Sequence, residues 1–559
     1  MSASADRASS GEHERGPRTE PMSIGETTIG HPLDRVCTVL AVAGIALLAI
    51  RRWTLVGPFP PGLDGAQWLA LGRGMDGQAI GRSTEGAYAP LVPVLAATTE
   101  FVAGPLSAVR LLAAASSLVL SLAVWFVARG ALGSVWGLIV TSIVIPASAL
   151  AEPTLFGGYP QQFALAAGII ALWAVCRYLS QRSGISGVPT WPTSVGATPA
   201  IASPMSHSRD VTGFQDSPLT HVAVSQDRSL VLVGIAALLT AAAHHIYFPV
   251  VTLAILAAVG LRLADRSRMN DPARSVRSLA LALAPALALF AALAFAFMRA
   301  GYAAPLDASA RSFVDAWEYG TRESPELWLV ILATGAVGLA IRRQVQVCGD
   351  PARLVAVSLV MPAGLLFFLS GQPRLLPPIL IGAGIAAGLC ARWVASIGPR
   401  AHAATLLFAI AIAAALVIPA DRASTQFADF YRVVDEPLVR AAAVIESDGN
   451  PGAIAVRKDR RGWPIGWWFE ALVDRPVIVG SDPRWLAFPA EREHARQADA
   501  LFDGGLDSET FRQRAIASGV RYLVIAKWDW IGWERWLTTP GFPVATLYDD
   551  DRYLVLRIS

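Results

Sequence analysis

A succession of long apolar runs constrains the fold of this 559-residue chain more than any other feature of its sequence. A helix needs about 20 mainly apolar residues to cross the hydrocarbon core of a bilayer. About eleven such runs lie between residues 33 and 419, so we predict an α-helical polytopic membrane protein. The predicted spans are Leu33–Ile50, Ala108–Ala128, Leu132–Leu150, Gln161–Leu179, Leu230–His245, Phe248–Leu263, Leu279–Met298, Leu327–Ile341, Leu354–Leu369, Leu375–Val394 and Ala403–Ile418.

Charge separates this apolar part from the C-terminal end of the chain. Charged residues make up 16% of the chain, against about 25% in soluble proteins. Of the 43 acidic residues, 21 lie within residues 420–559. The net charge of +3 is small and no basic cluster stands out, which argues against a nucleic-acid partner.

These contrasts predict three regions. Residues 1–32 are rich in Ser, Gly, Glu and Arg and are expected to form a disordered cytoplasmic tail. Residues 33–419 form the transmembrane domain, and within it residues 183–228 have the composition of a flexible cytoplasmic linker. Residues 420–559 have the patterns of a small extracytoplasmic α/β domain. Its expected strands are Ala453–Val456, Pro476–Gly480, Tyr522–Ala526, Val544–Tyr548 and Tyr553–Ile558, and its expected helices are Asp435–Ser447, Ala490–Phe502 and Asp507–Ser518.

Arginine orients the predicted helices, because cytoplasmic loops of membrane proteins carry an excess of Lys and Arg. One set of alternating loops is rich in arginine, which places the N-terminus in the cytoplasm and the C-terminal domain outside. This alternation requires that Tyr88–Gly104 does not cross, and its two prolines and Glu100 favour a helix along the outer membrane surface. The orienting residues are Arg129, Arg177, Arg182, Arg262, Arg266, Arg268, Arg274, Arg277, Arg342, Arg343, Arg353, Arg392 and Arg400.

Asp64 is the first candidate for chemistry. It follows the first predicted span, where a carboxylate can reach the head group of a membrane-bound substrate and act as a general base or a metal ligand. The competing interpretation is an N-cap, since a helical run follows at Ala66–Arg73.

The order of segments around Asp64 resembles that of a known superfamily. Asp64 is followed by the proline-containing stretch Tyr88–Leu95, then by Ala108–Leu112 and an apolar helix that ends at Arg129. This resembles the first outer loop of GT-C-type membrane glycosyltransferases, which include protein mannosyltransferases and lipid A aminoarabinose transferases. The segment Gln372–Pro378 is similar to a second motif of these proteins. The resemblance implies transfer of a sugar from a polyprenyl-phosphate carrier.

The chain also departs from the superfamily pattern. Many relatives carry Asp-Glu in the first loop, where this chain has Asp64-Gly65. Leu375 replaces the tyrosine of the later motif. A member with an altered or inactive site is therefore the second interpretation.

Further candidates lie in other outer loops. Glu152 precedes Gly157-Gly158 and Tyr159. Some relatives place a second carboxylate in this loop, so the resemblance implies that Glu152 is a second catalytic candidate, which can pair with Asp64 around a metal or an acceptor. Arg374 lies where the chain re-enters the membrane, and a guanidinium suits the phosphate of a lipid-linked donor. The alternatives are a solvated loop acid for Glu152 and a lipid-headgroup contact for Arg374.

The supporting polar candidates are His244, His245, Tyr88 and Tyr159. Ionisable groups near the membrane mark functional sites by default, although histidines at an interface are also satisfied by water or backbone. Adjacent histidines point about 100° apart on a helix, so both ligate one metal only if the helix breaks there. A divalent metal is a candidate cofactor, with Asp64, Glu152 and His244 as its candidate ligands.

The preferred function is that of a membrane glycosyltransferase that moves a sugar from a polyprenyl-phosphate donor to a cell-envelope acceptor on the outer membrane face. The expected partners are this donor, the bilayer and an envelope glycan, lipid or protein. The alternative is a non-catalytic GT-C-like scaffold or transporter-like protein whose outer domain binds envelope polymer.

Overall fold

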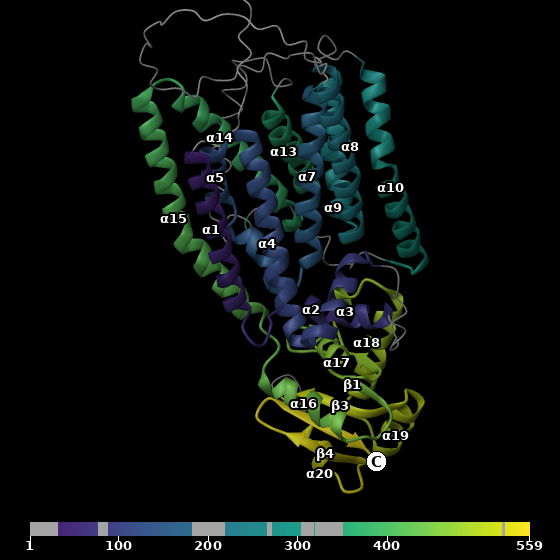
Figure 1. Cartoon of the computed structure of the whole chain (residues 1–559). Coiled ribbons are helices and arrows are strands. Elements are labelled where there is room, and N and C mark those ends of the chain that lie inside the picture. Colours follow the sequence, from purple (N-terminus) through teal and green to yellow (C-terminus); the bar gives the residue numbers. More distant parts are fainter. Residues whose placement is uncertain are drawn as a thin grey trace, which may run out of the picture.

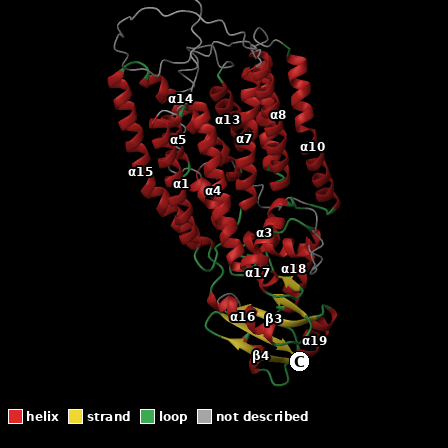
Figure 2. Cartoon of the chain, in the orientation of Figure 1, coloured by secondary structure: helices red, strands yellow, loops and turns green. Residues whose placement is uncertain are grey.

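The structure, a computed structural model, describes residues 32–75, 88–181, 218–264, 271–302, 318, 350–527 and 532–559. The predicted N-terminal tail, most of the predicted linker and the predicted span Leu327–Ile341 lie outside the described residues. The rest forms a bundle of long helices with a small sheet domain at one end (Figures 1 and 2).

Eight described helices are long and apolar enough to cross a membrane, or nine spans if one bent pair counts as one. The long helices are α1 (Pro32–Val56), α4 (Pro105–Leu132), α7 (Tyr159–Gln181), α8 (Pro218–Ala243), α9 (Tyr247–Ala264), α10 (Pro272–Arg299), α13 (Pro351–Ser370), α14 (Leu376–Ala395, preceded by the 3-10 helix η2, Pro373–Leu375) and α15 (Pro399–Tyr431). Among these, α8 is not one of the eight, because its apolar part, Arg228–Ala243, is shorter than 18 residues. A polytopic α-helical membrane protein is therefore confirmed.

The predicted span Leu132–Leu150 is not one straight helix. It consists of α5 (Ser134–Val144) and α6 (Ser148–Phe156), which bend by 57° relative to each other. Pro146 lies in the break, and a proline interrupts the helical hydrogen bonds because it has no N–H to donate. The bend lets α6 carry Glu152 towards the end of the bundle where α7 begins.

Two short helices cover the end of the bundle that faces the sheet domain, which we term the junction end (Figure 1). They are α2 (Asp64–Met75) and α3 (Leu91–Ala103). With 13 residues, α3 is about 20 Å long and too short to cross a bilayer. This agrees with a segment Tyr88–Gly104 that does not cross.

The last long helix continues past the predicted domain boundary at residue 420. With 33 residues, α15 is about 50 Å long, whereas the hydrocarbon core is about 30 Å thick. Pro419 lies inside it without ending it. The end of α15 at Tyr431 therefore reaches the C-terminal domain and contacts the junction end.

The C-terminal domain is a five-stranded sheet with strand order β2-β1-β3-β5-β4. Strands β2, β1 and β3 are parallel, and β5 pairs antiparallel with both β3 and β4. The predicted strands and helices are all present, with ends that differ by at most two residues. They are β1 (Ala453–Val456), β2 (Val477–Val479), β3 (Val520–Ala526), β4 (Val544–Asp549) and β5 (Tyr553–Ile558), with α16 (Glu436–Ser447), α18 (Pro489–Leu501) and α19 (Ser508–Ala517). Three short helices were not predicted: α17 (Gly466–Leu472), η3 (Pro483–Trp485) and α20 (Glu534–Thr538).

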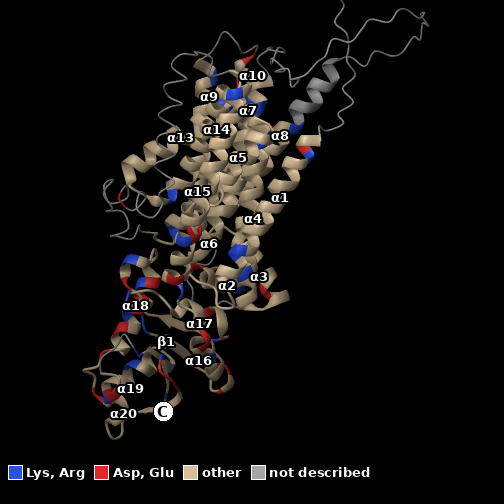
Figure 3. Cartoon of the chain, turned by 90° about the vertical axis from the view of Figure 1, so that its left-hand side faces the viewer, with Lys and Arg blue, Asp and Glu red and all other residues tan. Residues whose placement is uncertain are grey.

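One apolar core joins the C-terminal domain to the junction end. Val56 of α1 and Leu69 of α2 are fully buried in the same cluster as Trp468 of α17 and Val456 of β1. Figure 3 shows acidic and basic residues gathered in the C-terminal domain and at the bundle ends, with few along the middle of the helices. The middle of the helical surface is therefore compatible with contact to lipid. At the junction end, apolar side chains pack against the C-terminal domain instead.

Candidate active site at the junction end

Asp64 is the first residue of α2 and lies where two loops meet in backbone contact. Gly62 has φ +91°, and a Cβ there would lie 2.4 Å from the carbonyl carbon of Phe156. Gly157 has φ +101°, and a Cβ there would lie 2.4 Å from the backbone nitrogen of Gly65 and 2.8 Å from Cβ of Asp64. Only glycine fits at both positions. The backbone at Gly157 is thus in close contact with the Asp64 turn.

Hydrogen bonds from three elements fix this turn. The indole of Trp68 on α2 donates to the Gly157 carbonyl at 2.6 Å, and the indole of Trp468 on α17 donates to the Gly62 carbonyl at 3.0 Å. The Gly62 N–H donates to the Tyr431 carbonyl at the end of α15, at 2.8 Å. The C-terminal domain therefore helps to set the position of Asp64.

The surroundings of Asp64 are short of polar partners. Within the part of the chain that the structure describes, its side chain makes no hydrogen bond, so the N-cap interpretation has no support there. Burial raises the pKa of Asp64 to about 6, and the positive charge of Arg374 partly opposes this rise. At neutral pH the site thus holds an ionised carboxylate that is a stronger base than an ordinary aspartate.

Tyr159, at the start of α7, faces the same turn. Its side chain is fully buried, and its hydroxyl has no hydrogen-bond partner among the described residues. A Cβ at Gly65 would lie 3.4 Å from this hydroxyl. A buried hydroxyl without a partner costs about 1–3 kcal/mol, which is expected where a substrate supplies the missing partner.

Arg374 lies in η2, between α13 and α14, and its side chain is exposed. Its guanidinium has no hydrogen bond to any described residue, yet its charge acts on Asp64, His244 and His245. The charge of Arg374 thus links four candidates that are up to 310 residues apart in sequence, with this cation within electrostatic range of the Asp64 carboxylate.

Glu152 on α6 belongs to the same region through an intermediary. It accepts a hydrogen bond from the Tyr431 hydroxyl at 2.7 Å. The carbonyl of Tyr431 in turn accepts the N–H of Gly62. Glu152 is therefore tied to the Asp64 turn by Tyr431, a residue that the sequence analysis did not select.

His244 and His245 lie between α8, which ends at Ala243, and α9, which begins at Tyr247. Their rings stack at a centroid distance of 4.9 Å and an interplanar angle of 7°. The helix is broken at this point, which is the exception that the sequence analysis allowed, so the two rings do not point about 100° apart as they would on a continuous helix. Burial is the main cause that lowers the pKa of His244 far below its ordinary value and that of His245 to about 4, so both are neutral at pH 7.

Tyr88 belongs to an aromatic cluster that spans both domains. Its hydroxyl accepts a hydrogen bond from the Gln67 amide at 3.1 Å. Its ring contacts Trp68, Phe297 of α10 and Phe488 of the C-terminal domain at centroid distances of 5.5–5.8 Å. Its position supports a packing role at the mouth of the site.

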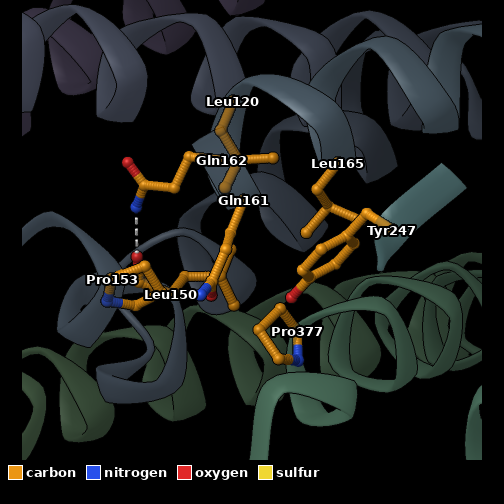
Figure 4. Close-up of a pocket in the computed structure, with 8 residues that line it drawn as sticks. All are labelled: Leu120, Leu150, Pro153, Gln161, Gln162, Leu165, Tyr247 and Pro377. Atoms are coloured by element: carbon orange, nitrogen blue, oxygen red, sulfur yellow. Dashed lines mark hydrogen bonds between the residues drawn. The ribbon is translucent and has the colours of Figure 1, made fainter. Parts of the chain in front are cut away.

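A small pocket lies beside these residues, between α4, α6, α7, α9 and α14 (Figure 4). It is mainly apolar, with the amides of Gln161 and Gln162 and the hydroxyl of Tyr247 as its polar groups. The Gln162 amide donates to the Leu150 carbonyl at 2.8 Å. The lining residues are Leu120, Leu150, Pro153, Gln161, Gln162, Leu165, Tyr247 and Pro377. Among the described residues, no group of three or more His, Cys, Asp or Glu side chains is arranged to hold a metal ion.

No known protein-family profile and no curated protein sequence matches the chain. Several solved structures, in contrast, match the fold of the chain. The archaeal oligosaccharyltransferase AglB from Archaeoglobus fulgidus, in complex with an inhibitory peptide and a dolichol-phosphate, aligns over 89% of this chain and 69% of its own, with a TM-score of 0.54 and 12% identity.

Two further structures align with nearly all of the chain. ArnT from Cupriavidus metallidurans in the apo state matches 94% of this chain and 98% of its own, with a TM-score of 0.52 and 12% identity. The arabinofuranosyltransferase AftD from Mycobacteria matches 94% of this chain and 40% of its own, with a TM-score of 0.56 and 14% identity. The chain therefore has the GT-C fold of these membrane glycosyltransferases, as its motifs suggested.

Proposed function

We propose that the chain is a membrane glycosyltransferase that moves a sugar from a polyprenyl-phosphate carrier to a cell-envelope acceptor. The observation that carries the proposal is the half-buried carboxylate of Asp64 within electrostatic range of the Arg374 guanidinium, which makes no hydrogen bond to a described residue, at the junction end of a GT-C fold. The bound dolichol-phosphate of AglB supports a lipid-linked donor. The arginines at the opposite bundle end support a reaction on the outer membrane face.

The residues have distinct roles in this reaction. Asp64 accepts the proton of an acceptor hydroxyl while that oxygen forms a bond to the anomeric carbon of the donor sugar. The bond between the anomeric carbon and the phosphate oxygen breaks, and polyprenyl phosphate leaves. Arg374 stabilises the negative charge of the departing phosphate through charge-assisted hydrogen bonds. Glu152 and Tyr159 are placed to orient the Asp64 turn and the acceptor.

The test is transfer by the purified protein in lipid nanodiscs. Farnesyl-phosphate-linked mannose, arabinose and glucose serve as donors, and an envelope extract serves as acceptor. Asp64→Asn keeps the size of the side chain but cannot take up a proton, so transfer should fall by at least about 100-fold. Arg374→Ala should mainly raise the donor KM, and Arg374→Lys should restore part of the loss.

Asp271→Asn is the matched control. Asp271 caps α10 at the opposite bundle end, and asparagine is an equally good N-cap, so transfer and expression should stay unchanged. Normal transfer by Asp64→Asn would contradict the catalytic role. No transfer from any donor by the wild type, with donor binding intact, would instead favour a non-catalytic scaffold.

A further inference from the structure

The turn between α8 and α9 contains a side chain that caps the start of α9. The His244 side chain is buried, and its Nδ1 accepts the backbone N–H of Ile246 at 3.1 Å and of Tyr247 at 3.3 Å. These N–H groups open α9 and have no partner within the helix. His244 is therefore the cap of α9, and its proton resides on Nε2.

The capped residue reaches across the bundle to a distant turn. Tyr247 is 2% exposed, and its ring meets that of His244 edge-on at a centroid distance of 5.4 Å. Its hydroxyl donates to the backbone carbonyl of Arg374 at 2.5 Å. Figure 4 shows the same hydroxyl directed towards Pro377, one turn after Arg374. One hydrogen bond thus links two turns that are 127 residues apart.

The position of the Arg374 charge depends on the backbone of the turn that carries it. Its guanidinium makes no hydrogen bond to a described residue, so the backbone of η2 sets the position of its charge. Prolines at 373, 377 and 378 stiffen this segment, and the Leu375 N–H donates to the Gln372 carbonyl. The bond from Tyr247 then fixes where the stiffened turn lies relative to α9.

We propose that Tyr247 is a positioning residue for Arg374, held in place by the capping side chain of His244. This inference rests on the proposed function, in which Arg374 holds the donor phosphate. Tyr247 does not touch the phosphate, and its effect passes entirely through the Arg374 turn. A buried hydroxyl on α9 thereby adjusts the affinity for a polyprenyl phosphate through the position of the Arg374 turn.

Direct binding of farnesyl phosphate to the full-length protein in nanodiscs tests the inference without requiring turnover. Arg374→Ala should weaken binding by about 10- to 100-fold, because a charged hydrogen bond is lost. Tyr247→Phe keeps the ring and removes the hydroxyl, so binding should weaken by about 2- to 10-fold. Tyr178→Phe, a buried tyrosine at the far end of α7, is the control and should bind as the wild type does.

The double variant separates positioning from a general structural effect. If Tyr247 acts only through Arg374, Tyr247→Phe should cause no further loss in the Arg374→Ala background. An equal loss in both backgrounds would overturn the inference and leave the proposed function intact. So would normal binding by Tyr247→Phe when Arg374→Ala binds weakly. Absence of binding by the wild type would count against the proposed donor itself.

Two substitutions of His244 test the capping step. Asparagine is a good helix cap and alanine is a poor one. His244→Ala should therefore weaken binding about as much as Tyr247→Phe, and His244→Asn should stay near the wild type. Equal losses in the two variants would show that the cap does not hold Tyr247.

Discussion

At the residue scale, Asp64 is charged in surroundings that penalise its charge. Its burial raises the pKa to about 6, and Arg374 lowers it less than burial raises it. A general base must be ionised to accept a proton, so the proposed activity should depend on this ionisation. Desolvation also makes the ionised form less stable in the fold than it is in water, and such shifts are common for catalytic carboxylates.

We expect the transfer rate to fall about tenfold per pH unit below pH 6 and to level off above it. Initial rates measured between pH 4.5 and 8.5 define this acidic limb of the pH–rate profile. In Arg374→Ala the limb should move to higher pH, because the charge that favours the ionised carboxylate is gone. A limb near pH 4, the ordinary range of Asp, would show that the base is a different group or that Asp64 is solvated.

The same shift has a consequence for stability with a definite sign. The pKa of Asp64 is higher in the folded state than the unfolded value of about 3.9. The wild type should therefore lose stability relative to Asp64→Asn as the pH rises from about 4 to 6. Melting temperatures measured at pH 4.5 and 7.5 test this expectation: the melting temperature of the wild type should fall relative to that of Asp64→Asn at the higher pH.

At the element scale, the approach of the α6–α7 turn to the start of α2 positions the site. Gly157 and Gly133 both have positive φ, at +101° and +85°, so alanine strains the backbone at either position. They differ in their surroundings: a Cβ at Gly133 meets no atom within 4 Å, whereas one at Gly157 meets the Asp64 turn. The pair therefore isolates the effect of close approach.

We expect Gly157→Ala to reduce transfer by about 10-fold or more, because a displacement near 1 Å at a catalytic group has effects of that size. Gly133→Ala should keep most of the activity and show only the backbone penalty in its melting temperature. Comparable activities in the two variants would mean that the contact between the turns does not set the position of Asp64.

At the scale of the whole molecule, four of the long helices carry an arginine at the bundle end opposite the C-terminal domain, although Arg51, Arg52, Arg110 and Arg299 lie at the junction end. Arg129, Arg262, Arg353 and Arg392 all lie at helix ends away from the junction end. This distribution predicts that the C-terminal domain lies outside the cell.

Reporter fusions test this orientation. A fluorescent protein inserted within residues 183–228 should be fluorescent in the cytoplasm, and alkaline phosphatase fused after Ser559 should be active outside. Activity of both reporters on one side of the membrane would contradict the topology. A truncation before residue 432 is a less direct test, because it also removes the shared packing around Trp468.

The sequence by itself determined the elements, because apolar periodicity and charge are local properties of the chain. It located β1 at Ala453–Val456 and the break at His244, and it selected Asp64 and Arg374 as ionisable groups where few are tolerated. The bend between α5 and α6 was not predicted, although Pro146 marks it in the sequence. The extension of α15 to Tyr431 was not predicted because it depends on what packs against the end of that helix.

Only the tertiary structure decided which segments meet. The contact between Gly62 and Phe156, the bond from Tyr431 to Glu152 and the bond from Tyr247 to Arg374 join residues 94 to 279 positions apart. The chemistry of a tyrosine hydroxyl or a glycine is the same wherever it occurs along the chain. Its role depends on the residue that it contacts in the folded protein. That contact depends on the fold of the whole chain, so the local sequence around either residue does not predict it.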